Sequence, residues 1–511
     1  MSHIQSHHGG ADEAHKTFLV LLKVYGDTIQ LWSREKMSTI GKTHFFRISC
    51  HNVETNLDLP GSNIQVFTLS EPAQMHEEVC SFADQFALGQ PIGARQLAIF
   101  MTGPVSSLRK ASYAIDLALS SDGNTDDDSE VQEQQISDSN ELVDKIGSAY
   151  LYLDPNFSSQ GIQRTPIIAR QTHLPIGQMQ IEYLIVTNPI GYGQPAIRPD
   201  WLLGKRCFEA GHRGSGSGRR VDLPEDLLEN TIASFNYAHR HGADMCELDV
   251  VVSADGVPVV YHDFDVDAVA AQQSCDQLGK FRVQVNQFTV KQLRDFQFLA
   301  LHDGEGHAYT LNVPNQAESN RPFPTLAEVL DQVDESCGLN VEIKWPQMLE
   351  SGKMEAKRFC EINYFVDRII DVCDRHAANR HIVLESFDAD LTLMLRLKQN
   401  RFPVVFLNQG MTDRYERYVD TRARSIFNGV YFAQAFGLAG IDIISDYYLS
   451  MGKQLVDFIK SHDLIPRGWG DMGENSEILD LLRGYGLQCI TYDRIDQMKR
   501  PKQSVDDTNC D

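Results

Sequence analysis

From residue 208 onward, short apolar runs alternate with longer stretches in which apolar residues recur at helical spacing. Short apolar runs bounded by turn residues are typical of strands buried in a parallel sheet, and apolar residues three or four positions apart are typical of helices. Eight strands that alternate with helices indicate an α/β fold, a TIM (β/α)8 barrel. The pattern predicts these strands at residues 208–211, 244–250, 339–343, 381–385, 404–407, 429–432, 464–468 and 487–491.

Helix start signals support this alternation. A predicted helix at 229–241 follows a Pro-Glu-Asp start, and another at 325–336 begins at Thr325, directly after Pro324. Residues 264–324 are too many for an ordinary strand-to-helix loop, although they include a helical pattern near 291–298. The sequence therefore predicts a small insertion at about 264–324.

The N-terminal part has a different pattern, in which apolar runs alternate with Gly, Pro and Asn turns, so we expect it to be β-rich. Between residues 120 and 144 the chain is acidic and lacks Lys and Arg, and it cannot bury enough apolar surface to offset its ordering entropy. The predicted organisation is a disordered tail at 1–16, a β-rich domain at 17–119, an acidic linker at 120–144, a second β-rich block at 145–199, the barrel with its insertion at 200–500 and a flexible tail at 501–511.

Charge and cysteine content exclude several classes of function. The formal net charge of -24 argues against nucleic acid or an anionic membrane surface as the main partner, since both need clustered Lys and Arg. The apolar run at 17–22 is too short for an export signal or a membrane span, so we expect no stable membrane insertion. Ten cysteines are scattered singly, which predicts free thiols and a cytoplasmic location.

Four short charged stretches each follow or end an apolar run, and they carry the candidate chemistry. Because alternate side chains of a strand share a face, two carboxylates of Glu-Leu-Asp and the charged pair of Glu-Ile-Lys can each point the same way. Oxygen ligands flanked by histidines and fixed cations are what metal-assisted hydrolysis of a phosphate ester needs. The pattern therefore predicts a phosphodiesterase site. Its stretches are His212-Arg213-Gly214, Glu247-Leu248-Asp249, His262-Asp263 and Glu342-Ile343-Lys344.

With these stretches the chain resembles the glycerophosphodiester phosphodiesterases. The resemblance rests on EAGHRG at 209–214, on the run from LLENTIASF to PVVYHD at 227–263, and on NVEIKW, ESFDADL and ITYDRI further on. The version found here is most similar to the eukaryotic cytosolic branch that hydrolyses glycerophosphocholine. The resemblance implies metal-dependent hydrolysis of that substrate to choline and sn-glycerol 3-phosphate.

Chemistry and resemblance together assign roles to seven residues. Glu247, Asp249 and Glu342 are expected to hold one divalent cation, with oxygen ligands favouring Mg²⁺ or Ca²⁺. His212 and His262 are expected to act as general acid and base, while Arg213 and Lys344 bind the phosphate oxygens. Attack by water and attack by a neighbouring glycerol hydroxyl both stay open.

Other interpretations remain beside this one. Lysophospholipids are an alternative substrate for the same barrel, and a barrel that serves as a non-catalytic scaffold is another class of function. Weak glycan binding by the N-terminal β-rich domain also stays open, with Trp32 as its strongest stacking residue. Trp469, at a strand end, is expected either in the core or against a choline cation. Glu229 and Asn230 are expected either to cap a helix or to contact the phosphate site.

Overall fold

The structure is a computed structural model that divides into two compact units. The N-terminal unit comprises Met1–Gln74, Cys80–Gly193 and Glu361–Asn363, and the barrel unit comprises the rest. Of the predicted tails and the acidic linker, only residues 16, 120, 143 and 144 fall inside the described ranges. These ranges are 16–32, 44–59, 63–71, 73–76, 80–86, 89–120, 143–154, 158–204, 206–223, 226–269, 280–295, 298–300, 309–311, 316–358, 360–470 and 475–498.

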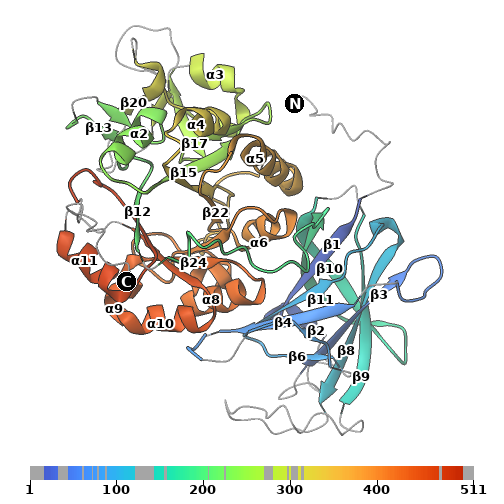
Figure 1. Ribbon diagram of the computed structural model, residues 1–511. Coiled ribbons are helices and arrows are strands. Elements are labelled where there is room, and N and C mark those ends of the chain that lie inside the picture. Colours follow the sequence, from blue (N-terminus) through green and yellow to red (C-terminus); the bar gives the residue numbers. More distant parts are fainter. Residues whose placement is uncertain are drawn as a thin grey trace. The chain divides into compact units, whose positions relative to one another are not determined.

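The N-terminal unit is built on one antiparallel sheet with the strand order β5-β4-β7-β1-β11-β10-β9-β8-β3-β6, and β2 also pairs with β11. This sheet contains strands from both predicted β-rich blocks, because β8 pairs with β9 and β1 pairs with β11 (Figure 1). The strands are β1 (Phe18–Tyr25), β2 (Ile29–Leu31), β3 (His44–Asn52), β4 (Ile64–Ser70), β5 (Ala83–Asp84), β6 (Gln90–Ile92), β7 (Gln96–Thr102), β8 (Ala111–Ser120), β9 (Val143–Tyr152), β10 (Gln160–Ala169) and β11 (Pro175–Thr187).

Alternation of polar and apolar residues explains which face of this sheet is buried. In β10 and β11 buried and more exposed positions alternate over much of each strand, as expected for a sheet with one face against a core. Large side chains such as Phe46, Phe100 and Tyr113 fill that core. Short 3₁₀ turns at Gly26–Thr28 and Leu108–Lys110 lead into β2 and β8.

The barrel unit contains eight parallel strands in the order β12-β26-β25-β24-β23-β22-β21-β15, and the pairing of β12 with β15 closes the ring. The antiparallel strand β16 (Pro258–Val260) extends β15. The predicted TIM barrel with preceding β-rich structure is therefore confirmed. Its strands are β12 (Phe208–Gly211), β15 (Met245–Val252), β21 (Gly338–Ile343), β22 (Ile382–Ser386), β23 (Val404–Asn408), β24 (Gly440–Ile444), β25 (Ile465–Trp469) and β26 (Cys489–Tyr492).

One predicted strand is wrong. Residues 429–432 lie inside helix α8 (Ile426–Ala435), and the sixth barrel strand is β24. A short apolar run does not distinguish a buried strand from a buried helix, and α8 is buried along most of its length. Its start is marked by Ser425, whose side chain accepts a hydrogen bond from the backbone N–H of Asn428.

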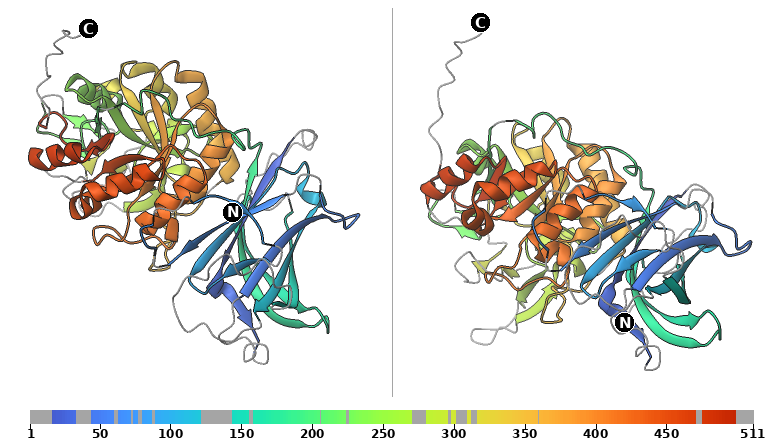
Figure 2. Two further views of the ribbon diagram at one scale, coloured as in Figure 1. Left: turned by 60° about the horizontal axis from the view of Figure 1, so that its bottom comes forward. Right: turned by 90° about the horizontal axis from the view of Figure 1, so that it is seen from below.

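Helices cover the outside of the barrel strands, as the views in Figures 1 and 2 both show. Thr325 caps α4 and forms a capping box with Glu328, so its predicted role as a helix cap is confirmed. None of the described helices has the length and apolar character needed to cross a membrane. The helices are α2 (Ile232–Arg240), α3 (Val290–Asp295), α4 (Leu326–Gln332), α5 (Ile362–His376), α6 (Ala389–Lys398), α7 (Thr421–Arg424), α8, α9 (Ser445–Met451), α10 (Lys453–Ser461) and α11 (Ser476–Tyr485).

Between β16 and α4 the chain forms a small sheet with the order β18-β17-β19-β20, the region in which the sequence predicts an insertion. A separate two-stranded ribbon, β13-β14, lies between β12 and α2. The elements of these regions are β13 (Arg219–Arg220), β14 (Leu227–Leu228), β17 (Asp265–Val269), β18 (Lys280–Gln284), β19 (Phe298–Ala300), β20 (Tyr309–Thr310) and the 3₁₀ turns Val285–Gln287 and Glu318–Asn320.

Candidate active site

Most of the predicted site residues lie on or just after adjacent barrel strands, and His262 follows the antiparallel strand β16. His212 directly follows β12, Glu247 and Asp249 lie on β15, and Glu342 lies on β21 with Lys344 just beyond it. In the parallel pairing of β15 and β21, Asp249 is the register partner of Glu342. Strand register therefore brings together carboxylates that are far apart in the sequence, at the end of the barrel where such enzymes carry their sites.

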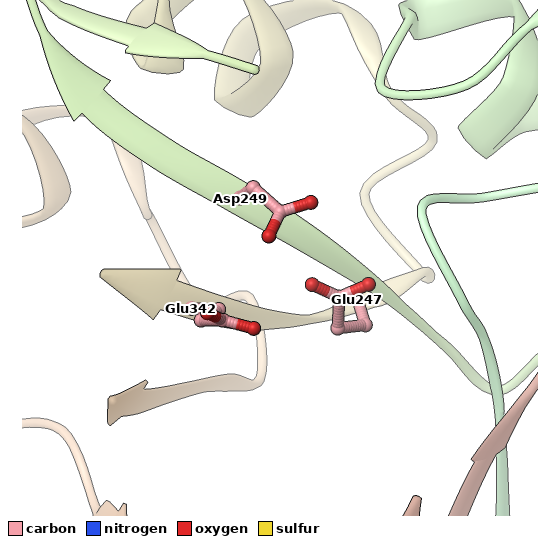
Figure 3. Close-up of side chains that lie close together, drawn as sticks. All are labelled: Glu247, Asp249 and Glu342. Carbon is pink, nitrogen blue, oxygen red and sulfur yellow. The ribbon is translucent and has the colours of Figure 1, made fainter. Parts of the chain in front are cut away.

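The three carboxylates form a compact cluster. Figure 3 shows Glu247 and Asp249 on one strand and Glu342 on its neighbour, and one oxygen of each lies within 4.8 Å of the others. Glu247 is 4% exposed and Asp249 is 1% exposed. One oxygen of each of these two, Oε1 of Glu247 and Oδ1 of Asp249, is buried without a hydrogen-bond donor. Buried carboxylate oxygens without donors fit a divalent cation, because such a cation accepts several oxygen ligands at once.

The pKa shifts within the cluster also fit a bound cation. Burial, together with the charges of Asp249 and Glu342, raises the pKa of Glu247 well above its ordinary value. Burial by itself would also raise the pKa of Asp249, but the cationic groups nearby, His262 and Lys344 first, lower it. Lys344 Nζ lies 2.9 Å from Glu342 Oε1 and 3.6 Å from Asp249 Oδ1. These charges outweigh burial and raise the pKa of Lys344, so it is held as a cation beside the cluster.

Each of the two histidines has its Nδ1 against a carboxylate. His212 Nδ1 lies 2.8 Å from Asp493 Oδ1, and His262 Nδ1 lies 2.6 Å from Asp263 Oδ1. A carboxylate only accepts, so each pair favours the proton on Nδ1 and leaves Nε2 free to exchange a proton. Burial opposes ionisation of Asp493, but the charge and hydrogen bond of His212 lower its pKa to about 2.

Arg213 is fixed by its backbone and by its side chain. Its backbone φ is +48°, and its N–H donates to Glu247 Oε2 at 2.8 Å. Its guanidinium lies 3.0 Å from Glu229 Oε2 and 3.6 Å from Asp249 Oδ2. Gly214 allows this close turn, since a Cβ there would lie 2.5 Å from the hydroxyl of Ser234 and its φ is +88°.

Sequence reasoning left the supporting residues without a firm role. Asn230 donates from Nδ2 to Asp249 Oδ2 at 2.9 Å, and its Oδ1 accepts from the backbone N–H of Asp249 at 3.3 Å. Glu229 holds the guanidinium of Arg213. Asp263 and Asp493 orient the histidines. The residue types were visible in the stretches ENT, HD and YDRI, but their partners were not, because the partners depend on the closed barrel.

A cavity of about 770 Å³ opens above these groups. Six of the seven predicted site residues line it, and Asp249 lies buried beside it. Aromatic residues also line it, among them Phe387, Tyr415 and Trp469. The six are His212, Arg213, Glu247, His262, Glu342 and Lys344.

The barrel gathers carboxylates, histidines and two fixed cations around one cavity. This arrangement defines the class of (β/α)8 barrels with a site for an anionic, phosphorylated ligand. Residues 212–497 match the model of the glycerophosphoryl diester phosphodiesterase family, and the chain belongs to this family.

Relatives agree with the family assignment. The chain is 32% identical to glycerophosphocholine phosphodiesterase GPCPD1 of Homo sapiens over 346 residues, which cover 66% of this chain and 51% of the human protein. It is 31% identical to the Mus musculus protein of the same name over 375 residues, covering 69% and 55%. The chain thus spans about half the length of these relatives. The predicted family, and its glycerophosphocholine phosphodiesterase branch, are confirmed.

The solved structures that are similar to this chain include a phosphodiesterase from Oleispira antarctica, determined in complex with the product sn-glycerol-3-phosphate. It is 17% identical, with a TM-score of 0.39, and the match covers 57% of this chain and 94% of that one.

Proposed function

We propose that this chain hydrolyses glycerophosphodiesters, with glycerophosphocholine as the preferred substrate and choline and sn-glycerol 3-phosphate as products. The observation that carries the proposal is the cluster of three carboxylates at a cavity that two carboxylate-bound histidines also line. The names of the human and mouse relatives support the choice of substrate.

In this proposal Glu247, Asp249 and Glu342 hold one divalent cation, Mg²⁺ or Ca²⁺. Their buried oxygens without donors fit such an ion. When bound, the cation acts as a Lewis acid that neutralises the charge of the phosphate oxygens. The choice between the two ions depends on coordination number, which carboxylates alone leave open.

Arg213 and Lys344 bind the remaining phosphate oxygens. Arg213 presents a planar fork whose position is set by Glu229, whereas Lys344 provides a point charge. Both cations are largely buried, with side chains 16% and 13% exposed, so their attraction for a phosphate is weakly screened by water. When the substrate phosphate binds, it would replace some of the contacts that Arg213 and Lys344 make with carboxylates. Both cations would then still have an anionic partner.

His212 and His262 transfer protons through their Nε2 atoms. One takes the proton of the attacking oxygen, and the other donates a proton to the leaving alcohol oxygen. The attacking oxygen belongs to water or to the glycerol hydroxyl next to the phosphate. Release of a cyclic glycerol phosphate during single-turnover hydrolysis would identify the second route.

A substrate panel tests the proposal: glycerophosphocholine, glycerophosphoethanolamine, glycerophosphoinositol and lysophosphatidylcholine, each with and without a chelator. We expect turnover of glycerophosphocholine that stops with chelator and returns with excess Mg²⁺ or Ca²⁺. Glu247→Gln should raise the metal concentration needed for half-maximal rate, whereas Glu335→Gln, an exposed carboxylate outside the cavity, should not. A preference for lysophosphatidylcholine would overturn the substrate, and chelator-insensitive turnover would overturn the metal.

Two further points stay predictions. The buried cysteines Cys246, Cys337, Cys373 and Cys489 are free thiols, which supports the predicted cytoplasmic location because reducing compartments keep thiols reduced. Trp32 in the N-terminal unit is 52% exposed, as a glycan-stacking residue needs to be, but the relatives lend glycan binding no support.

A further inference from the structure

Part of the cavity wall is aromatic. Strands β12, β15 and β21 carry the cluster and its neighbours, and β22 to β26 complete the ring. Phe387 follows β22, Tyr415 lies on the segment after β23, and Trp469 ends β25. All three side chains line the cavity.

The three rings form one continuous wall. The centroids of Phe387 and Trp469 lie 5.3 Å apart with the rings nearly perpendicular at 82°. The centroids of Tyr415 and Trp469 lie 6.0 Å apart at 34°. The indole Nε1 of Trp469 is buried without a hydrogen-bond partner, so ring packing, rather than a hydrogen bond, holds this side chain. Tyr415 is 49% exposed, which leaves its ring accessible to a ligand.

Beneath this wall the cavity has an acidic floor. Glu385 and Asp442 both line the cavity, and each is 1% exposed. Glu385 Oε2 and Asp442 Oδ1 have no hydrogen-bond donor. Both carboxylates pair with Arg467, whose Nη2 lies 3.4 Å from Glu385 Oε2 and whose Nε lies 3.1 Å from Asp442 Oδ2. Two carboxylates thus share one guanidinium, and a second positive charge would complete the pairing.

The protonation of Asp442 agrees with a shortage of positive charge. Burial, only partly offset by Arg467, raises the pKa of Asp442 to about 6. Arg414 also lines the cavity, but Asp446 pairs with it at 2.9 Å.

A quaternary ammonium group fits this combination of features. It has a fixed positive charge and no N–H to donate, so it needs aromatic faces and nearby negative charge rather than hydrogen-bond acceptors in set positions. We propose that Phe387, Tyr415 and Trp469, above the floor of Glu385 and Asp442, bind the trimethylammonium group of a phosphocholine ester. This inference rests on the proposed phosphodiesterase function and specifies how its head group is recognised.

The test compares glycerophosphocholine with its neutral isostere, the glycerophosphate ester of 3,3-dimethylbutanol, in which carbon replaces the ammonium nitrogen. The measured quantity is the ratio of the two kcat/KM values within one enzyme preparation, so damage shared by both substrates cancels. We expect a wild-type ratio of roughly 3- to 30-fold, the range that cation–π attraction supplies.

Variants locate the source of that ratio. Trp469→Leu and Tyr415→Leu should lower it towards one, and Trp469→Phe, which keeps a ring, should retain most of it. Asp442→Asn should also lower it, because the floor loses a charge. The control Tyr364→Leu removes a half-exposed aromatic residue outside the cavity and should leave the ratio unchanged. Circular dichroism checks that each variant is folded.

Each outcome separates the two proposals. A wild-type ratio near one, or a ratio that survives Trp469→Leu and Tyr415→Leu, overturns the ammonium subsite while leaving the phosphodiesterase intact. No turnover of either ester overturns the phosphodiesterase itself. The comparison is then repeated with lysophosphatidylcholine and its neutral isostere. The result tells whether the aromatic wall selects a water-soluble phosphocholine ester or a lysophospholipid.

Discussion

Removal of the Asn230 side chain gives a quantitative test of the carboxylate cluster. Asn230 is 2% exposed and makes two hydrogen bonds to Asp249, at 2.9 Å through its Nδ2 and at 3.3 Å through its Oδ1. Its φ is +56°, so Asn230→Gly removes both bonds while keeping a backbone conformation that glycine adopts freely. Among the described residues, Asp249 Oδ2 would then keep its ion pair with Arg213 Nε, at 3.6 Å.

The expected loss follows from that geometry. A buried hydrogen bond to a charged group contributes about 1.5 to 3 kcal/mol, which corresponds to roughly 10- to 150-fold in an equilibrium constant. Because the amide orients Asp249, most of this loss should appear in metal affinity, where outer partners of metal ligands typically contribute about 10- to 100-fold. At saturating metal, kcat should fall only a few-fold.

The assay is the rate of glycerophosphocholine hydrolysis as a function of Mg²⁺ and Ca²⁺ concentration, together with urea unfolding in chelator. Asn188→Gly is a matched control, since Asn188 also has a positive φ, of +51°, but is exposed and lies in the N-terminal unit. A large fall in kcat at saturating metal, with an unchanged half-saturating concentration, would falsify the positioning role and place Asn230 against the substrate.

Three further outcomes are expected. His212→Ala and His262→Ala should each lower kcat by roughly 10²- to 10⁴-fold with metal affinity retained, and only the mutant that lacks the general acid should recover on a nitrophenyl phosphodiester. A histidine mutant that regains full rate with excess metal would instead mark a metal ligand. The pKa of Asp493, lowered from 3.8 to about 2, makes its ionised form stabilise the fold above pH 4, and this contribution is lost as the pH falls towards 2. Urea unfolding of wild type and Asp493→Asn at pH 5, 3 and 2 should therefore converge at the lowest pH, and parallel curves would contradict the pairing with His212. A fragment that starts at Ile197 should fold and keep its phosphodiesterase activity; a folded but inactive fragment would show that earlier residues complete the site.

The local pattern of apolar and polar residues predicted most barrel strands. It failed where a short apolar run fits both a buried strand and a buried helix. Strands β15 and β21 combine apolar residues with Glu247, Asp249 and Glu342, so both pattern and chemistry placed them. The run at 429–432 offered only apolar residues, and these pack equally well in a buried helix. Ser425, as a helix cap, was the available signal that favours the helix.

The sequence by itself determined which chemical groups the site contains and at which strand ends they stand, because side-chain alternation places Glu247 and Asp249 on one face whatever the rest of the fold does. Only the tertiary structure decided which groups meet. His212 and Asp493 are 281 positions apart, and they come into contact because β12 and β26 are neighbours in the closed ring. Pairings of this kind follow from strand order and register, which are set by packing of the whole barrel and leave no trace in local periodicity.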